Sequence, residues 1–558
     1  MDICSRLPTE VQDMVLHRLR SSKDLKSLRL VDWHLNRVAT PFLWETLSII
    51  FCDFRNRDIE DLLDSDVPRH VKYLTVRACQ HDNHNGWPTG FEANVMRLLC
   101  ALPRDALRVF DCTDGLDVIA LEMLLKLQTG LRELVYKTKD VGAYRRVPRP
   151  AWIRDSFKHV RRLGVFLKRN DGVDFGAWLK HMPALEVLEV NGTLHRVGPV
   201  ETRVFQLLGW PLPPPAIVLQ SLRLNHMRLP NDVRSLYDTF AFSQLKTLEI
   251  EACTHSVGLL QHLVQEFLQV ATKPALKRFV YADQQDQGTI RHVEDFLSSF
   301  SGLGTLYVDC AKALPLHRAC IVAHGAFPET VILNTHSMWT NATLIDPYYY
   351  SSAALLRIAR ACPNIKELGI HISPINLGTW PALQPHRLLH NTKFAERLRA
   401  IAHFTKLHTL RLTTAPKISN PHRQSIPVHS MQAMCQQAAT EIMSFLANHG
   451  SPVKVLAFSP VRINMAEMPN IAEIKGTLDG NGHGWPHYYY QRGEVKLPSS
   501  IVKTIAMPWS KKAMVEEQGT ISEMEMLMFL LAKHKVVWGI MLGRLNCVIS
   551  LAASSDLA

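Results

Sequence analysis

The residues that could carry out catalysis do not gather into a recognisable pattern along this sequence. No Gly-x-x-x-x-Gly-Lys phosphate loop and no Gly-x-Ser-x-Gly nucleophile turn occurs in it. The glycine-rich run at 480–484 leads into Trp485 and Pro486, whereas a nucleotide site requires a following helix. The 26 histidines are dispersed and form no catalytic group. We therefore expect no catalytic residues and no cofactor, and we interpret the chain as a non-enzyme.

Candidate metal ligands are equally sparse. Cys79, His81 and His84 have a loose metal-like spacing, but no second pair of ligands accompanies them, so we expect no metal site. The 11 cysteines are scattered and odd in number, which is typical of reduced thiols and not of a secreted disulfide framework. The sequence therefore favours a cytoplasmic or nuclear location, or both.

Charge and hydropathy restrict the possible partners. The formal net charge of +12 favours encounters with acidic partners, yet no recognised nucleic-acid module is present, and we expect no nucleic-acid partner. The apolar stretch 526–551 is interrupted by Lys533, His534, Lys535 and Arg544, so it is too charged for a membrane-spanning helix. We expect no membrane association.

A repeated apolar pattern predicts the elements that must position any binding residues. The pattern has apolar residues at i, i+3 and i+5, the Leu-x-x-Leu-x-Leu core of a leucine-rich repeat. Each copy predicts a short strand whose i+3 and i+5 side chains point inward. A weaker copy lies near Val331. The twelve clear copies begin at Val71, Leu107, Leu131, Val160, Leu185, Leu219, Leu245, Leu276, Leu303, Ile365, Leu407 and Val453.

Helical patterns and prolines separate these strands. Helical segments are expected at 91–102, 257–270, 353–361 and 394–404, and prolines often stand just before a strand, where a helix must stop. This order predicts an α/β fold, an irregular leucine-rich-repeat solenoid or horseshoe with strands on the concave face. We place the solenoid at 51–459, after an N-terminal helical segment at 1–50. A degenerate C-terminal repeat or cap and a poorly readable tail occupy 460–558.

The N-terminal segment has its own apolar spacing. Val11, Val15 and Leu19 recur at intervals of four and predict one apolar stripe on a helix. A second helical pattern follows, and Pro41 is expected to close the segment. Two short helices bury little apolar surface, so the stripe must pack on the next domain or on another protein. The apolar residues of the second pattern are Leu25, Leu28, Val31 and Leu35.

These residues resemble the F-box. The similarity rests on Leu7-Pro8-x-Glu10-Val11, on the apolar spacing that follows and on the run Leu28-Arg29-Leu30-Val31. The resemblance covers less than a tenth of the chain. It implies binding to a Skp-class adaptor and, through it, to a cullin–RING ubiquitin ligase. The adaptor-binding residues that it implies are Leu7, Pro8, Glu10, Val11, Val15, Leu19, Leu25, Leu28 and Val31.

Outward strand positions supply candidate residues for binding an unknown protein substrate. Their charges are mixed, whereas eight copies carry Lys or Arg at i+1, which predicts a basic row along one rim. A solvated strand edge is the alternative interpretation of that row. The outward candidates are Arg162, Arg223, Glu249, Glu251, Tyr307, His371 and Arg411. The basic row comprises Lys72, Arg108, Arg132, Arg161, Lys246, Lys277, Lys366 and Lys454.

The sequence thus predicts the substrate-recognition subunit of a Skp–cullin–F-box ubiquitin ligase, with catalysis residing in its partners. Two alternatives remain open at this point. One is a leucine-rich-repeat scaffold or adaptor that acts outside a ubiquitin ligase. The other is an activity within residues 460–558, where the sequence pattern is least informative.

Overall fold

The computed structural model divides into two compact units, Met1–Leu303 and Gly304–Ala558. Both are mixtures of α-helices and mostly parallel β-strands, with thirteen α-helices among the described residues. The structure describes residues 9–19, 22–31, 33–51, 56–78, 90–138, 152–167, 179, 181–192, 200–201, 217–229, 240–269, 276–283, 289–310, 315–334, 349–372, 375–379, 388–414, 416–419, 428–458, 462–463, 489–496 and 502–509.

Three helices open the first unit: α1 (Thr9–Arg18), α2 (Ser22–Arg29) and α3 (Trp33–Trp44). They enclose a small core of their own, because α3 supplies apolar side chains that two helices alone would lack. Leu19, Leu28 and three residues of α3 pack around that core. Its buried members are Leu16, Leu25, Ala39 and Leu43.

The expectation that Pro41 closes this segment is wrong, because Pro41 lies inside α3. Proline removes one backbone donor and usually disrupts a helix. The last turn nevertheless packs: Leu43 is buried, and Phe42 and Trp44 contact the same core. The hydroxyl of Thr40 donates to the Asn36 carbonyl at 2.6 Å. Tertiary packing therefore keeps the helix intact beyond the proline.

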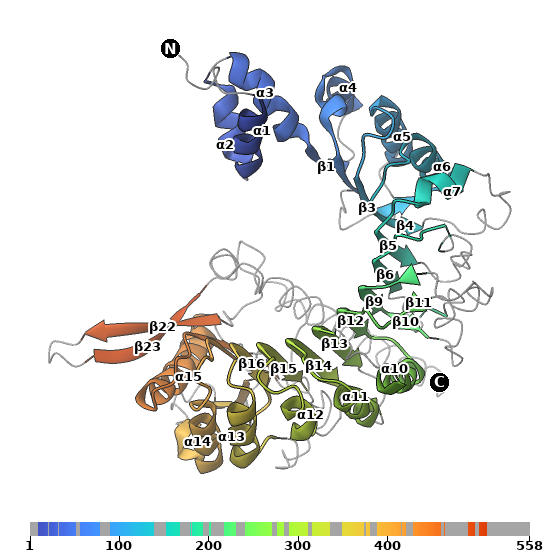
Figure 1. Ribbon diagram of the computed structural model, residues 1–558. Helices are drawn as coiled ribbons and strands as arrows, with labels where there is room; N and C mark the ends of the chain where they lie inside the picture. The colour runs from blue at the N-terminus through green and yellow to red at the C-terminus, as the bar shows by residue number, and fades with distance from the viewer. Residues whose placement is uncertain are drawn as a thin grey trace, which may run out of the picture. The chain divides into compact units, whose positions relative to one another are not determined.

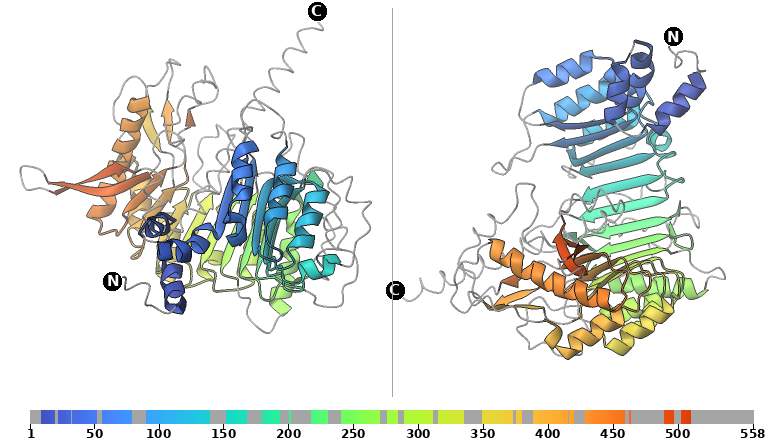
Figure 2. Two further views of the ribbon diagram at one scale, coloured as in Figure 1. Left: turned by 90° about the horizontal axis from the view of Figure 1, so that it is seen from above. Right: turned by 90° about the vertical axis from the view of Figure 1, so that its left-hand side faces the viewer.

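Nine strands form the parallel sheet of the first unit, and they lie side by side in sequence order (Figures 1 and 2). Register is kept along the sheet: Leu222, for example, pairs with Leu248, which pairs with Phe279. The strands are β1 (Thr46–Phe51), β2 (Tyr73–Ala78), β3 (Val109–Leu116), β4 (Glu133–Thr138), β5 (Arg162–Leu167), β6 (Val187–Gly192), β9 (Ser221–Asn225), β12 (Thr247–Glu251) and β13 (Arg278–Asp283).

The described helices cover one face of this sheet, and none of them covers the other, which we call the open strand face (Figure 1). A side-chain cap starts α6, whose first turn is stabilised when the Asp117 carboxylate accepts the Ala120 N–H at 2.7 Å. The covering elements are α4 (Asn56–Asp64), the 3₁₀ turn η2 (Val67–His70), α5 (Phe91–Ala101), α6 (Val118–Leu127), α7 (Trp152–Phe157), α10 (Ser256–Gln269) and α11 (Thr289–Ser298).

The second unit continues the same alternation and then departs from it. Its parallel strands are β14 (Thr305–Cys310), β15 (Thr330–Asn334), β16 (Glu367–Ile370), β18 (Thr409–Leu412) and β20 (Val455–Phe458), followed by antiparallel β22 (Tyr489–Lys496) and β23 (Val502–Pro508). Its helices are α12 (Arg318–Val322), α13 (Ser352–Ala361), the 3₁₀ turn η6 (Leu388–His390), α14 (Thr392–Ile401) and α15 (Val428–Asn448).

The outer edge of β23 is covered by side chains of α15. Gln436 donates to the carbonyl of Ala506 at 3.1 Å, and Ser444 donates to that of Thr504 at 2.9 Å. Thr440 accepts the Ala506 N–H at 3.1 Å. The three side chains recur every four residues on one helical face, so they replace a further strand and protect the edge from pairing with other chains.

Short strands form three small accessory sheets. The pairs are β7 (Val200–Glu201) with β10 (Met227–Arg228) and β8 (Ile217–Val218) with β11 (Phe240–Ala241). The third sheet contains β17 (Asn376–Thr379), β19 (Lys417–Ser419) and β21 (Arg462–Ile463). None of the described helices has the length and apolar character needed to cross a membrane.

The predicted strands are confirmed. All twelve clear copies of the apolar pattern lie on strands, and the weaker copy near Val331 lies on β15. Every i+3 and i+5 side chain of the twelve clear copies is buried on the helix-covered side. Strand β1 was not predicted, and it crosses the expected boundary at residue 50. Of the expected C-terminal cap and tail at 460–558, the structure describes residues 462–463, 489–496 and 502–509.

Candidate functional site: an apolar N-terminal surface and a charged strand face

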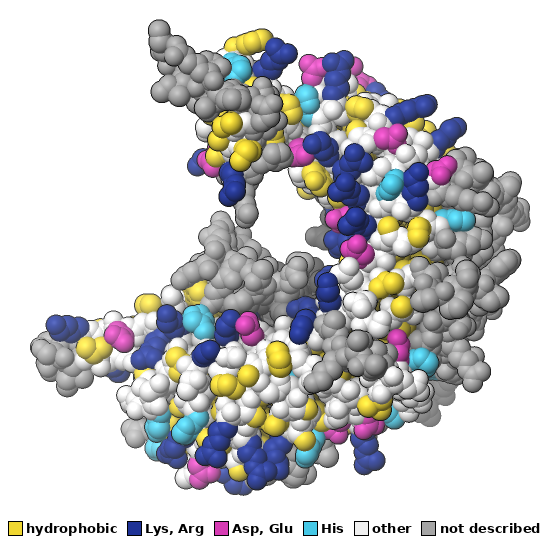
Figure 3. Space-filling model, viewed as in Figure 1, with side chains coloured by type: hydrophobic (Ala, Val, Ile, Leu, Met, Phe, Trp, Pro, Cys, Tyr) yellow, Lys and Arg dark blue, Asp and Glu magenta, His cyan; other side chains and the backbone are white. Residues whose placement is uncertain are grey.

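Two surfaces of the first unit could bind partners. One is the apolar surface of the N-terminal helices, where Figure 3 shows hydrophobic side chains exposed to solvent. The other is the open face of the parallel sheet, where charged side chains from neighbouring strands meet. In the described part of the chain no group of three or more His, Cys, Asp or Glu side chains could hold a metal ion. Cys79, His81 and His84 lie outside the described residues.

The predicted adaptor-binding residues separate into exposed and buried members. Val15 is 51% exposed and Val31 is 67% exposed, and Val11 is also exposed. Leu25 is buried in the core of the three helices, and Leu19 and Leu28 pack against that core. Leu7 and Pro8 lie outside the described residues, as does the side chain of Glu10. The exposed members can contact a partner directly, whereas the buried ones maintain the helices that present them.

Three further exposed apolar side chains accompany these residues. Met14 lies on α1, one residue before Val15, and Leu30 lies just after α2. Trp33, at the start of α3, is 73% exposed and lies beneath the Arg37 guanidinium at 5.8 Å. Met14 could have been found from its i+3 spacing to Val11. Single exposed apolar residues are ordinary, but this many on three short helices favour a protein partner.

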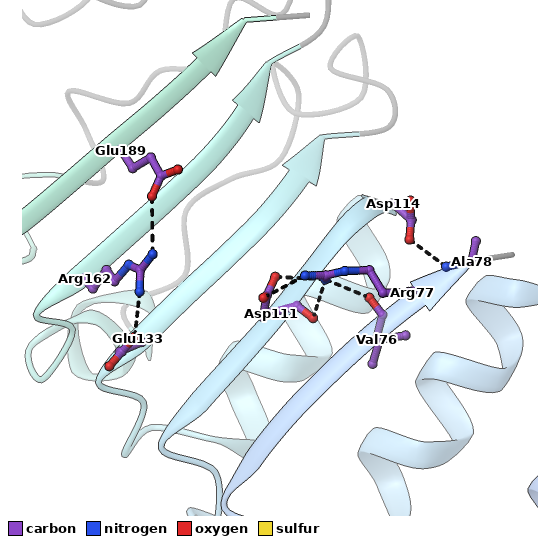
Figure 4. Close-up of polar contacts among 8 residues, drawn as sticks. All are labelled: Val76, Arg77, Ala78, Asp111, Asp114, Glu133, Arg162 and Glu189. Atoms are coloured by element: carbon purple, nitrogen blue, oxygen red, sulfur yellow. Dashed lines mark hydrogen bonds and ion pairs between the residues drawn. The ribbon is translucent and has the colours of Figure 1, made fainter. Parts of the chain in front are cut away.

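Charged side chains on the open strand face form ion pairs between neighbouring strands (Figure 4). Arg162 lies between Glu133 and Glu189 and is 3.4 Å from a carboxylate oxygen of each. On the first strands, Arg77 makes a bidentate contact with Asp111 at 3.0 and 2.9 Å. Burial is only partial here, so each pair contributes little stability, but together the pairs fix the positions of the charged groups.

Farther along the same face, two arginines share one carboxylate. Glu249 is 4% exposed, and its oxygens lie 2.7 Å from Arg278 and 3.4 Å from Arg223. Glu251, two residues later, is 7% exposed and has no ion pair among the described residues. Burial is the main cause that raises the pKa of Glu251 to about 8, and the neighbouring Glu249 adds to it.

The substrate-binding candidates of the second unit are in buried contacts. Tyr307 is fully buried. His371 stacks on Tyr349 with ring centroids 5.0 Å apart and lies 3.0 Å from the hydroxyl of Thr414. Arg411 forms a buried ion pair with Glu367. These side chains stabilise the unit and are not available for direct contact, because an outward strand position does not guarantee exposure.

The predicted basic residues of the first unit do lie in one row. Backbone hydrogen bonds connect Lys72 to Arg108, Arg108 to Arg132 and Arg132 to Arg161, each 2.7 or 2.8 Å long. The side chains at the two ends are paired: Lys72 is 2.9 Å from Glu45, and Arg161 is 3.6 Å from Glu186. The acidic partners at the two ends, Glu45 and Glu186, offset part of the positive charge of the row. The row therefore resembles a solvated strand edge more than a strong anion-binding site.

Comparisons with known proteins give no independent assignment. No model of a known protein family matches the chain, and no curated protein matches it. The functional conclusion must therefore come from the residues and surfaces described above.

Proposed function

We propose that the chain is the substrate-recognition subunit of a Skp–cullin–F-box type ubiquitin ligase. In this proposal the N-terminal helices are an F-box that binds a Skp-class adaptor. The remaining strands and helices form a leucine-rich-repeat solenoid that binds target proteins. The chain itself has no catalytic role, and ubiquitin transfer takes place on its partners in the cytoplasm or nucleus.

The observation that carries this proposal is the exposure of Val11, Val15 and Val31 on a segment that already has its own core. A segment whose core is complete does not need these side chains for folding. Burying one valine fully yields about 1.5–3 kcal/mol. Half of that remains to be gained at Val15 and two thirds at Val31, or about 2–3.5 kcal/mol for both. This gain corresponds to about 30- to 400-fold in affinity.

The experiment tests adaptor binding with charges placed on that surface. The full chain and its Val15→Glu/Val31→Glu variant are compared for co-purification with a Skp-class adaptor and a cullin from cell lysate. We expect the variant to lose both partners, because a buried, unpaired carboxylate costs several kcal/mol. Deleting residues 1–50 would be a blunter test, since it also removes most of β1, which pairs with β2.

A matched control keeps the result specific. Ile119 is an exposed apolar residue on α6, away from the N-terminal helices, and Ile119→Glu should leave adaptor recovery unchanged. Full recovery of the adaptor by the double variant would refute the proposal. If the unchanged full chain recovers the adaptor but no cullin, the result would instead favour the alternative function, a leucine-rich-repeat scaffold or adaptor outside a ubiquitin ligase.

A further inference from the structure

A directional series of hydrogen bonds on the open strand face ends at Asn225, which is the register partner of Glu251. Asn191, Asn225 and Glu251 occupy the same register position on β6, β9 and β12. The Glu189 carboxylate only accepts, so the Asn191 amide donates to it at 3.2 Å. The Asn191 oxygen then accepts from the Asn225 amide at 2.6 Å. The Asn225 oxygen is consequently an acceptor on the strand that neighbours Glu251.

Two acceptors therefore lie on adjacent strands without a donor. Among the described residues, neither Oδ1 of Asn225 nor Oε1 of Glu251 has a hydrogen-bond partner, and both atoms are buried. Asn225 and Glu251 lie directly opposite each other on strands about 4.8 Å apart, so one ammonium or guanidinium nitrogen placed between their side chains would donate to both oxygens. We call this pair of atoms, with their residues, the acceptor niche.

The arginines nearby are already engaged. Arg162 is held by Glu133 and Glu189, and Arg223 and Arg278 both pair with Glu249. A buried carboxylate without a cation or a hydrogen bond is costly and tends to take up a proton. The raised pKa of Glu251, about 8, agrees with this environment.

We propose that the acceptor niche binds a lysine or arginine side chain of a target protein. This inference rests on the proposed function only in taking the open strand face as the surface that receives targets. An incoming cation supplies the missing donors and neutralises the carboxylate. Asn225 as a whole is partly exposed, but the two oxygens are buried, so entry of the cation requires a small movement of the side chains around them. An acidic segment offers no donor to the two oxygens and would leave both unpaired.

Binding is coupled to ionisation of Glu251. The charged groups that act on it are Glu249 on the same strand, Arg223 on β9, Arg278 on β13 and Glu189 on β6. A cation binds the ionised carboxylate and displaces its proton. Affinity should therefore rise up to tenfold per pH unit from pH 6 until the pH reaches about 8, the pKa of free Glu251, and should be constant above it.

The test measures binding of acetyl-Gly-Arg-Gly-amide and acetyl-Gly-Lys-Gly-amide to the full chain by ligand-observed NMR between pH 6 and 9. The neutral citrulline analogue has the shape of the arginine peptide and serves as the ligand control. We expect at least one cationic peptide to bind at least tenfold more tightly than the citrulline peptide, with the pH dependence described above. Glu251→Gln should weaken binding at least tenfold and abolish that dependence.

Glu60→Gln is the matched protein control, because Glu60 is exposed on helix α4, in an ion pair with Arg97, and is not on the strand face that carries the niche. It should retain peptide affinity within twofold. Equal binding of the citrulline peptide, a flat pH profile of the wild-type protein, or unchanged affinity in Glu251→Gln would each overturn the inference. The first two results need no variant, so they hold even if Glu251→Gln misfolds. Adaptor co-purification is measured separately, so failure of this inference can be distinguished from failure of the proposed function.

Discussion

Replacing Glu251 by glutamine should change how the stability of the first unit depends on pH. In the folded protein burial raises the pKa of Glu251 to about 8 from its ordinary value of 4.5. The folded state therefore holds a proton that the unfolded state releases above pH 4.5. Stability from this group is fully present below pH 4.5 and is lost as the pH rises toward 8. The full difference is about 5 kcal/mol, at about 1.4 kcal/mol per pH unit.

Urea unfolding at a series of pH values measures this effect. The free energy of unfolding of the wild-type protein should fall by about 3 kcal/mol between pH 5 and pH 7.5, relative to Glu251→Gln. Taking the difference between the two proteins at each pH cancels the titration of shared groups. Hydrogen exchange of a peptide covering residues 245–255 assigns the transition to the strand that carries Glu251. Parallel pH profiles of the two proteins would refute the reasoning, because they would mean that Glu251 titrates alike in the folded and unfolded states.

Two further substitutions probe packing. Gly192→Ala would place a Cβ atom 2.1 Å from the backbone oxygen of His226. We therefore expect the free energy of unfolding, measured with urea, to fall by about 1–3 kcal/mol or more. An unchanged midpoint of the urea unfolding curve would contradict this close approach. Leu16→Ala should destabilise the N-terminal helices by about 2–5 kcal/mol and increase their proteolysis, because Leu16 is in the buried core. Val15→Ala should change their stability by less than about 0.5 kcal/mol. Equal proteolysis of the two variants would argue against the assigned core.

The strands could be predicted because their inward side chains are apolar at fixed spacing. Strand β1 escaped the same search for a specific reason. Its register pairs Leu47 with Leu74 and Ile49 with Val76, which makes Leu47 the i+3 residue and Ile49 the i+5 residue of the pattern. The first residue of the pattern, at position i, is therefore Trp44. Trp44 belongs to α3 and packs against the N-terminal core, and a tryptophan there hides the pattern. Strands β22 and β23 escaped because they are antiparallel and do not follow the repeat.

The N-terminal surface was only partly predictable. Spacing placed Val11, Val15 and Leu19 on one helical stripe, but Leu19 turns to the core while Val11 and Val15 are exposed. The difference arises from α3, a third helix that the sequence pattern did not predict and that continues past Pro41 to Trp44. Because a third helix covers part of the stripe, the exposed set could not be derived from the first two helices alone.

The chemistry of the open strand face depends on register, which spacing along one strand does not reveal. Glu249 and Glu251 look equivalent in the sequence, since both occupy outward positions of β12. Register places Arg223 directly opposite Glu249, whereas Glu251 faces Asn225 and, on the other side, Ala282. Among the described residues Glu249 therefore has two ion pairs and Glu251 has none, although they are two residues apart. The pairing of strands can thus bring charged and polar groups together without any local motif, and the surroundings of Glu251 are set in this way.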